Sequence, residues 1–425
     1  MSAPRPLNFL FTTIDGGGNV APIMAPIQKL VTRGHRVRVM CDEAGRDEAI
    51  AAGADFIPWS RAPNKQARSR ETDARDWAAA TPAEGLRELV EQLLCGMVLA
   101  YAQDVSEELE REPADLVVNF DMVFGVMTGC EARGQKLALL ATCISMFPIP
   151  GVPPFGAGLA PARSAAEAQL HAEIAAGATA LFDSGLTAFN EARAALGLQP
   201  LAHVLDQANA ATLRFLGTAR AFDFPSSALP SDIRYVGPLI RDPVWVSQWQ
   251  SPWAAIDQRP LVLAGFSTSF QDHAACLQRV INACAALPVR LLVTLGGAIR
   301  RDELEAAANT VLVESAPHVT VMREAAIVVT HGGHGTVMTA LLNRLPQLVI
   351  PHGRDQGDNA VRITERGAGL SLPATATTAE LQNALQRLLT DPSFREAAQR
   401  LGDAVAAEVQ RSTLIEELEA LAAQP

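Results

Sequence analysis

The chain of 425 residues has few aromatic and few charged side chains, and it has no long apolar run. Aromatic residues make up 5% and charged residues 19%, whereas 48% are hydrophobic, which is enough for a large core. The 46 acidic residues outnumber the 35 basic ones, and the net charge of −11 argues against a broad basic face for nucleic acid. The sequence contains no run of about eighteen uncharged apolar residues, so no membrane span is predicted. Residues 1–6 predict no secretory signal.

Cysteine is also scarce, with six residues and no Cys-x-x-Cys pair. Each cysteine lies in an apolar stretch, which is typical of free buried thiols and not of a disulfide framework. We therefore expect a reducing, cytoplasmic location. The cysteines are Cys41, Cys95, Cys130, Cys143, Cys276 and Cys284.

Short apolar runs alternate with longer helical patterns, and the alternation occurs twice along the chain. Continuous apolar strands separated by helices are typical of parallel sheets buried on both faces. We expect an α/β protein with two Rossmann-like, doubly wound domains. The predicted strands are residues 8–11, 37–40, 116–119 and 137–140, then 261–266, 290–294, 311–313, 326–330 and 347–350. The predicted divisions are a first domain at 1–240, a linker at 241–258, a second domain at 259–405 and a helical tail at 406–425.

Two segments interrupt this alternation. Residues 144–161 are rich in glycine and proline and are too long for a simple connection, so we interpret them as a binding loop. Trp245, Trp249 and Trp253 are spaced four apart, which would place them on one face of a helix. We interpret these tryptophans as packing the linker against a domain and not as a ligand platform.

A glycine-rich turn follows the first predicted strand, with the sequence Gly16-Gly17-Gly18-Asn19-Val20-Ala21. By itself it suggests NAD or FAD binding. The signal is weak, because tight turns between a strand and a helix generally use glycine. Pro22 and Pro26 also fit that fingerprint poorly.

The second half holds a more specific signal. The strand at 326–330 runs into His331-Gly332-Gly333-His334-Gly335-Thr336, and a helix is predicted over 337–342. Glycines let the backbone approach a ligand, and the unpaired N–H groups of a helix N-terminus suit a diphosphate. Asp355-Gln356 and Asn359-Ala360 follow the next strand at the same sheet edge. A carboxylate beside an amide can form hydrogen bonds with the vicinal hydroxyl groups of a ligand.

These motifs, with Pro346 and Pro351, resemble the nucleotide-sugar signature of family 1 glycosyltransferases, in particular the bacterial natural-product, macrolide and antibiotic-type branch. The resemblance covers most of the chain and implies the GT-B fold, in which two Rossmann-like domains face each other. It implies an inverting, metal-independent hexosyl or deoxyhexosyl transfer from a TDP- or UDP-sugar to a small apolar acceptor of aromatic or polyketide type. The nucleotide sugar is a co-substrate and no cofactor is expected. No Asp-x-Asp triplet supplies a metal clamp.

The resemblance places the donor site in the second domain. Where many members have an aromatic residue stacking on the base, this chain has Ser315, so the choice between UDP and TDP stays open. The implied residues are His331, Gly333, Gly335, Thr336, Ser267 and Thr268 for the diphosphate, Pro317 and His318 for base and ribose, and Asp355 and Gln356 for the sugar.

The first domain departs from the family at the catalytic base. The usual base lies three residues before a proline, and here Asn19 precedes Pro22. An amide does not accept a proton at neutral pH, so Asn19 can only orient an acceptor. Asp121, after the strand at 116–119, is the expected base and Asp15 is the alternative. Asp121 could instead only cap a helix beginning at residue 122.

Four apolar residues are expected to line the acceptor pocket, although each is also typical of an ordinary core: Met122, Phe124, Phe147 and Phe155. Three other functions stay open. They are a nucleotide-sugar isomerase or hydrolase on the same fold, an NAD-linked oxidoreductase using the first glycine loop, and a catalytically silent nucleotide-sugar-binding protein. The expected partners are a nucleotide sugar and a small-molecule acceptor, and a homodimer is compatible with the sequence.

Overall fold

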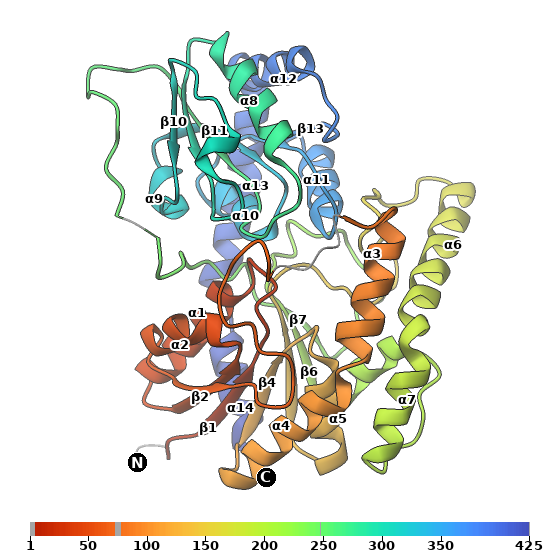
Figure 1. Ribbon diagram of the computed structural model, residues 1–425. Helices are drawn as coiled ribbons and strands as arrows, with labels where there is room; N and C mark the ends of the chain where they lie inside the picture. The colour runs from red at the N-terminus through yellow and green to blue at the C-terminus, as the bar shows by residue number, and fades with distance from the viewer. Residues whose placement is uncertain (1–4, 73–77, 247, 425) are drawn as a thin grey trace.

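The computed structural model describes residues 5–72, 78–246 and 248–424. Within them, the chain forms two parallel sheets, which lie in the lower and upper halves of the view in Figure 1. The first sheet has the order β3-β2-β1-β4-β5-β6-β7 and the second the order β10-β9-β8-β11-β12-β13. All pairings are parallel. The prediction of an α/β chain with two doubly wound units is confirmed.

Every predicted strand is present, and its ends lie within one residue of the predicted ends. Four further short strands, β3, β6, β7 and β13, are partly exposed and therefore lack the continuous apolar run of a central strand. The strands are β1 Asn8–Thr12, β2 Arg36–Cys41, β3 Asp55–Pro58, β4 Leu116–Phe120, β5 Leu137–Ala141, β6 Leu213–Leu216, β7 Ile233–Tyr235, β8 Leu261–Gly265, β9 Arg290–Thr294, β10 Thr310–Val313, β11 Ala325–Thr330, β12 Gln347–Val349 and β13 Gly369–Ser371.

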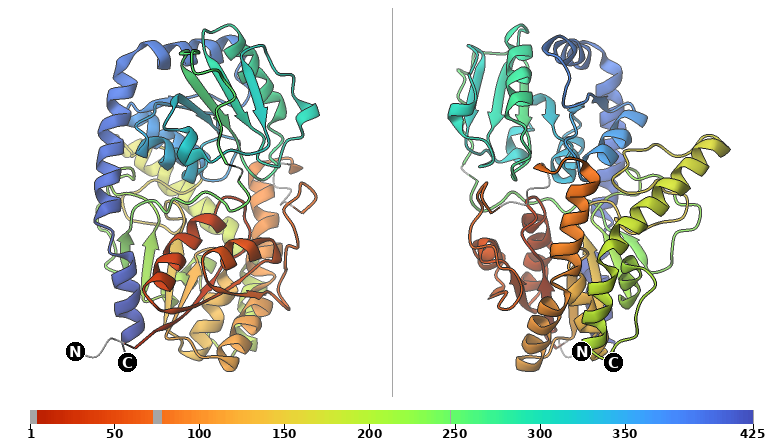
Figure 2. Two further views of the ribbon diagram at one scale, coloured as in Figure 1. Left: turned by 90° about the vertical axis from the view of Figure 1, so that its left-hand side faces the viewer. Right: turned by 45° about the vertical axis from the view of Figure 1, so that its right-hand side comes forward.

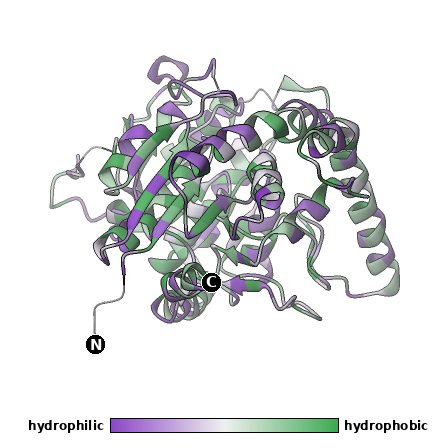
Figure 3. Ribbon diagram, turned by 90° about the horizontal axis from the view of Figure 1, so that it is seen from below, coloured by the Kyte–Doolittle hydropathy of each residue, from purple (hydrophilic) through white to green (hydrophobic). Residues whose placement is uncertain are grey.

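Helices cover both faces of each sheet. Hydrophobic segments gather toward the centre of the molecule in Figure 3. The helices are α1 Val20–Thr32, α2 Arg46–Ala51, α3 Pro82–Leu89, α4 Val98–Arg111, α5 Phe124–Arg133, α6 Ala165–Phe182, α7 Leu186–Ala195, α8 Ala274–Ala285, α9 His318–Val321, α10 His334–Leu342, α11 Gln356–Glu365, α12 Thr378–Thr390, α13 Pro392–Gln410 and α14 Leu414–Ala423. A π-helical turn, Val90–Cys95, joins the α3–α4 region, and 3₁₀ turns lie at Glu43–Gly45, Asp183–Gly185, Val204–Ala210 and Arg301–Glu303.

The C-terminal helices connect the two halves of the molecule. Figure 2 shows α13 and α14 running down one side from the second sheet to the first. The helix α13 crosses the predicted boundary at residue 405, and α14 buries its apolar face in the core of the first half. The residues of α14 in that core are Leu414, Ile415, Leu418, Leu421 and Ala422. Because α14 is needed to cover the first sheet, the chain ends in the half where it began.

The linker does not contain the helical face that the tryptophan spacing predicted. The described residues of 241–258 contain no helix, so that prediction is wrong. Trp249 and Trp253 nevertheless pack against a hydrophobic cluster of the second half, and the indole N–H of Trp249 donates to Glu324 at 3.2 Å. The packing interpretation is confirmed for these two side chains, whereas Trp245 is 41% exposed. Among the helices of the described residues, none has the length and apolar character to cross a membrane.

Candidate active site

The carboxyl edges of the two sheets face each other across the domain interface. The glycine loop after β1 lies against the loop after β8, since a Cβ added to Gly17 would lie 3.5 Å from the hydroxyls of both Thr268 and Ser269. On the second side, the His334 Nε2 atom lies 3.2 Å from the Gly217 carbonyl oxygen of the first half. In open parallel sheets, ligands bind at the carboxyl ends of the strands, so the candidate site lies between the halves.

The glycines after β11 shape an open helix N-terminus. A Cβ at Gly333 would lie 2.6 Å from the His331 Nε2 atom, so only glycine fits beside that ring. The helix α10 begins at His334, three residues before the predicted start, which places Gly335 and Thr336 in its first turn. A Cβ at Gly335 would meet nothing within 4 Å. The first-turn N–H groups are therefore accessible to an anion.

His331 lies behind this turn as a neutral imidazole. Burial lowers its pKa to about 3, and the nearby His273, His352 and Arg354 lower the pKa further, while a hydrogen bond with the Gly265 carbonyl opposes the change. A neutral ring that donates to Gly265 has no second N–H to offer. An arriving diphosphate favours the imidazolium, which can donate to both partners.

Sequence reasoning missed the histidines that accompany His331. The rings of His273 and His352 lie 5.6 and 5.4 Å from the Phe266 ring, and that of His331 lies 6.4 Å from it. Within the described residues, neither ring nitrogen of His273 has a hydrogen-bond partner, nor has the Nε2 atom of His352. These rings were not found because His273 follows the strand β8 by several residues and matches no motif.

The predicted sugar-binding pair begins α11. One oxygen of Asp355 accepts a hydrogen bond from the Asn359 amide at 2.9 Å, and burial raises the pKa of Asp355 to about 6. The Gln356 amide already has two protein partners. It accepts from the His352 backbone N–H at 2.7 Å and donates to Gln271 at 3.0 Å. Asp355 thus has free acceptor capacity for a sugar hydroxyl, whereas Gln356 mainly holds the loops together.

The hydroxyl loop after β8 is tied to the loop after β12. The Ser267 and Ser269 hydroxyls lie 3.0 Å apart, and Ser269 accepts from the Arg354 guanidinium at 3.0 Å. Thr268 is exposed at the edge of the interface. Ser269 and Arg354 were not predicted, although the continuous Ser267–Ser269 run could have suggested the first. Together they place a cation near the predicted diphosphate position.

The predicted base and ribose segment lies at the N-terminus of α9. The His318 Nε2 atom lies 3.2 Å from the Thr294 hydroxyl, and burial lowers the pKa of His318 to about 4. The Asp242 carboxylate, from the linker, accepts hydrogen bonds from the backbone N–H groups of His318 and Val319. Pro317 immediately precedes them as the N-cap residue. The linker thus contacts the segment expected beside the nucleoside.

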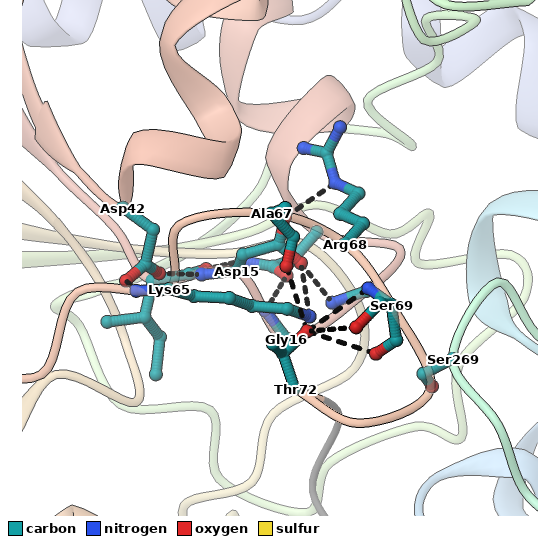
Figure 4. Close-up of polar contacts among 12 residues, drawn as sticks. Asp15, Gly16, Asp42, Lys65, Ala67, Arg68, Ser69, Thr72 and Ser269 are labelled. Carbon is teal, nitrogen blue, oxygen red and sulfur yellow. Dashed lines mark hydrogen bonds and ion pairs between the residues drawn. The ribbon is translucent and has the colours of Figure 1, made fainter.

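Asp15 is held by basic residues of a neighbouring loop (Figure 4). Its side chain is 1% exposed, the Arg68 guanidinium donates to it at 2.6 Å, and the Lys65 ammonium lies 3.7 Å away. It also accepts from the Gly17 backbone N–H at 3.1 Å. These contacts fix the glycine loop and leave little of the carboxylate accessible to an acceptor.

Asn19 likewise supports the glycine loop. Its amide oxygen accepts from the Gly16 N–H at 2.9 Å, and its amide nitrogen donates to the Thr13 hydroxyl at 3.1 Å and the Ile14 carbonyl at 2.8 Å. Both amide hydrogens have acceptors within the loop. The amide is therefore engaged in shaping the backbone and does not extend toward the second half.

Asp121 is a buried carboxyl without the capping role that the sequence left open. The helix α5 begins at Phe124, its N-cap is Val123, and no side chain caps it, so the helix-cap alternative is wrong. Asp121 is 5% exposed, and burial raises its pKa to about 7. A small hollow beside it, of about 10 Å³, is lined mainly by apolar side chains, including Phe147.

The loop between β5 and α6, residues 142–164, brings the two halves of the candidate site together. Burial raises the pKa of the Cys143 thiol well above its ordinary value, and the carboxylates of Asp355, Asp121 and Asp358 raise it further. The predicted base of the first half and the predicted sugar-binding carboxylate of the second thus both act electrostatically on Cys143. No periodicity in the sequence indicated that this loop would bring the two halves of the candidate site together.

The predicted acceptor residues differ in their exposure. Phe124 is 1% exposed and packs edge-on against Phe147 and Phe189, so it is part of the core, and its place in an acceptor pocket stays a prediction. Phe147 is buried but borders the hollow beside Asp121. Met122 and Phe155 are half-buried. No group of three or more potential metal-ligating side chains is placed to hold an ion within residues 5–72, 78–246 and 248–424.

Comparisons with known proteins agree with this arrangement. Residues 278–421 match the family model described as erythromycin biosynthesis protein CIII-like, C-terminal domain. The chain is 28% identical to 4'-demethylrebeccamycin synthase of Lentzea aerocolonigenes, over 94% of this chain and 95% of that protein. It is 24% identical to demethyllactenocin mycarosyltransferase of Streptomyces fradiae, over 95% and 86% of the two chains.

Two solved structures share the fold over nearly the whole chain. The kitacinnamycin glycotransferase has a TM-score of 0.76 and 17% identity, covering 99% of this chain and 100% of its own. The calicheamicin glycosyltransferase CalG4 has a TM-score of 0.74 and 20% identity, covering 98% of each. The protein is a glycosyltransferase of the GT-B fold. Residues 278–421 match an EryCIII-like C-terminal domain, and over most of its length the chain is similar to bacterial enzymes of natural-product biosynthesis.

Proposed function

We propose that this glycosyltransferase moves a hexosyl or deoxyhexosyl group from a TDP- or UDP-sugar to a small, apolar natural-product acceptor, with inversion and without a metal ion. The observation that carries the proposal is that the glycine loop after β1 lies against the hydroxyl loop after β8, which brings the carboxyl edges of the two sheets together. Two carboxyl groups, Asp121 after β4 and Asp355 after β12, come from these edges. Burial raises the pKa of Asp121 to about 7, which is near the value expected of a general base. The other begins the helix that follows β12 and suits a sugar hydroxyl.

In this reaction the acceptor hydroxyl oxygen forms a bond to the anomeric carbon while the bond from that carbon to the diphosphate oxygen breaks. The hydroxyl proton passes to the Asp121 carboxylate, and the electron pair leaves with the nucleoside diphosphate. The nucleophile approaches from the first half and the leaving group departs toward the second. A single displacement with this geometry inverts the anomeric centre.

The charge of the leaving diphosphate is stabilised by the protein in this proposal. The first-turn N–H groups of α10, with Gly335 and Thr336, supply donors at a positive helix end. Burial keeps His331 neutral in the free protein, and it gains a proton as negative charge arrives. The Arg354 guanidinium, held by Ser269, adds a fixed positive charge. Such preorganised groups replace a metal clamp.

The acceptor class rests on the apolar surroundings of Asp121. Phe147, with Leu139 and Phe215, lines the hollow beside it, and such apolar surroundings suit an aromatic or polyketide-like molecule. Similar proteins are named for such products, including a 10-deoxymethynolide desosaminyltransferase of Streptomyces venezuelae, which is 32% identical over 34% of each chain. The free cysteines in the described residues support a cytoplasmic location.

The test is a transfer assay with TDP- and UDP-sugars against a panel of aromatic and polyketide acceptors, with and without a chelator. We expect a glycosylated product by mass spectrometry, an inverted anomeric centre by NMR, and no effect of the chelator. Sugar release at the same rate without any acceptor would instead indicate a hydrolase. Nucleotide-sugar binding without product from any acceptor would indicate a silent binding protein.

A further inference from the structure

The β5–α6 loop is bound to α11 through one buried carboxylate. The backbone N–H groups of Gly156 and Gly158 donate to the two oxygens of Asp358 at 2.5 and 2.8 Å. Both glycines have positive φ angles, +80° and +62°, in the region that favours glycine. Successive N–H groups in such a conformation form a concave anion-binding nest. Here the anion is a side chain of the opposite half.

Asp358 lies one helical turn from the predicted sugar-binding carboxylate. It is three residues after Asp355, in a helix whose first turn also carries Asn359, the hydrogen-bond partner of Asp355. The helix is anchored again by Arg362, which donates to Asp223 of the first half at 2.7 Å. The nest is thus formed on the part of α11 that meets the sugar.

The same loop borders the predicted base at its other end. Ser145 and Phe147 line the hollow beside Asp121. Phe155, next to the nest, packs against the core of the first half and against the cluster between the halves. The loop therefore runs from the base to the sugar-binding helix.

The carboxylate in this contact is withdrawn from water, whereas Gly156 is exposed and Gly158 is half-buried. Asp358 is 2% exposed. Burial raises its pKa, whereas the Gly156 and Gly158 N–H groups and the Arg362 charge lower that pKa. Release of the loop would leave a buried carboxylate without its two donors. Hydrogen bonds to a charged group contribute more to stability than hydrogen bonds between neutral groups. The loop therefore has one strongly preferred position on α11.

We propose that Asp358 is a positioning residue that seats the β5–α6 loop on α11, so that the acceptor pocket and the donor sugar are aligned with each other. This inference rests on the proposed transfer reaction. In this proposal Asp358 takes no part in the chemical step and acts only by holding the loop in place. A loop that is displaced would misplace the acceptor and leave the nucleotide site of the second half intact.

The first test is Asp358→Asn, which keeps the side-chain size but replaces one acceptor oxygen by an amide that faces an N–H donor. We expect the acceptor KM to rise about tenfold or more, equivalent to about 1.4 kcal/mol or more. The Kd for nucleoside diphosphate, measured by calorimetry, should change less than about twofold. The positioning role would be overturned if the acceptor KM and the nucleoside diphosphate Kd rose equally, or if neither rose.

The matched control is Glu365→Gln. It removes the ion pair between Arg163 and Glu365, which joins the same loop to the same helix but at an exposed position, with Arg163 70% exposed. We expect transfer kinetics near those of the wild type, because exposed pairs contribute little. An acceptor KM raised as much as in Asp358→Asn would mean that any loop–helix contact suffices and would refute a specific role for the nest.

A second readout does not depend on sugar transfer. Amide hydrogen exchange over residues 150–160 should be faster in Asp358→Asn than in the wild type and unchanged in Glu365→Gln. Unchanged exchange in Asp358→Asn would refute the nest even if transfer is confirmed. Faster exchange without transfer to any acceptor would refute the proposed function alone. If Asp358→Asn does not fold, Gly156→Ala addresses the nest from the loop, and we expect it to raise the acceptor KM in the same way.

Discussion

Replacement of Asp121 by asparagine tests the proposed base and the cost of burying it. Asparagine preserves the shape of the side chain but does not accept a proton at neutral pH. General base catalysis contributes about 10²- to 10⁴-fold in rate, so we expect turnover with a hydroxyl acceptor to fall by that factor. The donor site lies in the other half, and nucleotide binding should be unchanged.

The pH dependence gives an independent check. Since burial raises the pKa of Asp121 to about 7, about a tenth of the groups are ionised at pH 6 and about a hundredth at pH 5. The wild-type kcat/KM should therefore fall about tenfold per pH unit on the acidic side of pH 7. This limb should be absent from the Asp121→Asn profile. Acceptors that are already ionised should lose least.

As the pH rises, the stability of the wild type should fall while its activity rises. The pKa of Asp121 rises from 3.8 to about 7 on folding, so the folded chain binds more protons than the unfolded chain between these values. Its stability therefore decreases as the pH rises through this window. At about 1.4 kcal/mol for each tenfold change in the acid dissociation constant, ionisation costs about 4 kcal/mol by pH 8 and less than about 2 kcal/mol at pH 5.

Denaturant titrations at pH 5 and pH 8 measure this cost. Asp121→Asn should be more stable than the wild type at pH 8, with a smaller difference at pH 5. Asp302→Asn, at a position 79% exposed, is the control and should differ little at either pH. Near wild-type turnover with every acceptor, or a stability difference that does not depend on pH, would refute the assignment of Asp121 as a buried base.

Three further substitutions and one chelation experiment test other parts of the structure. His331→Ala should lower kcat about 10²- to 10³-fold with little change in acceptor KM, and unchanged turnover in steady-state assays would limit the glycine loop to a structural role. Asn19→His should lower the melting temperature and not raise the rate, because the Asn19 amide makes three hydrogen bonds within its loop; faster transfer to phenolic acceptors would contradict this. Leu418→Ala should destabilise the chain by about 2–5 kcal/mol in denaturant titrations, since Leu418 is fully buried in the first core. Dialysis against a chelator should leave the rate unchanged, and loss restored by added Mg²⁺ would overturn the metal-free proposal.

The sequence alone was sufficient for the elements that are defined by local patterns. The central strands are continuous apolar runs because both their faces are covered, and such runs are visible without any tertiary information. The glycines after β11 were also visible, since a strand, a glycine turn and a helix follow one another directly in the chain. The predicted helix there began three residues late, because glycine and histidine are weak helix formers and concealed the first turn.

Local patterns were insufficient where a contact joins distant segments. The spacing of Trp245, Trp249 and Trp253 suggested a helix, but contacts with Glu324 and the second core hold an irregular segment instead. Short edge strands such as β3 and β13 depend on pairing and not on an apolar run.

The roles of polar residues depended most on the tertiary structure. In the sequence, Asp121 was the expected base, Asp15 the alternative, and Asn19 stood at the position of the usual base. Their surroundings separate them: Arg68 and Lys65 hold Asp15, the loop backbone holds Asn19, and burial alone governs Asp121. A pKa or a hydrogen bond is a property of neighbours in space. Sequence periodicity determines which face of an element is buried, but only packing of the two halves brings the Gly156 and Gly158 N–H groups to Asp358.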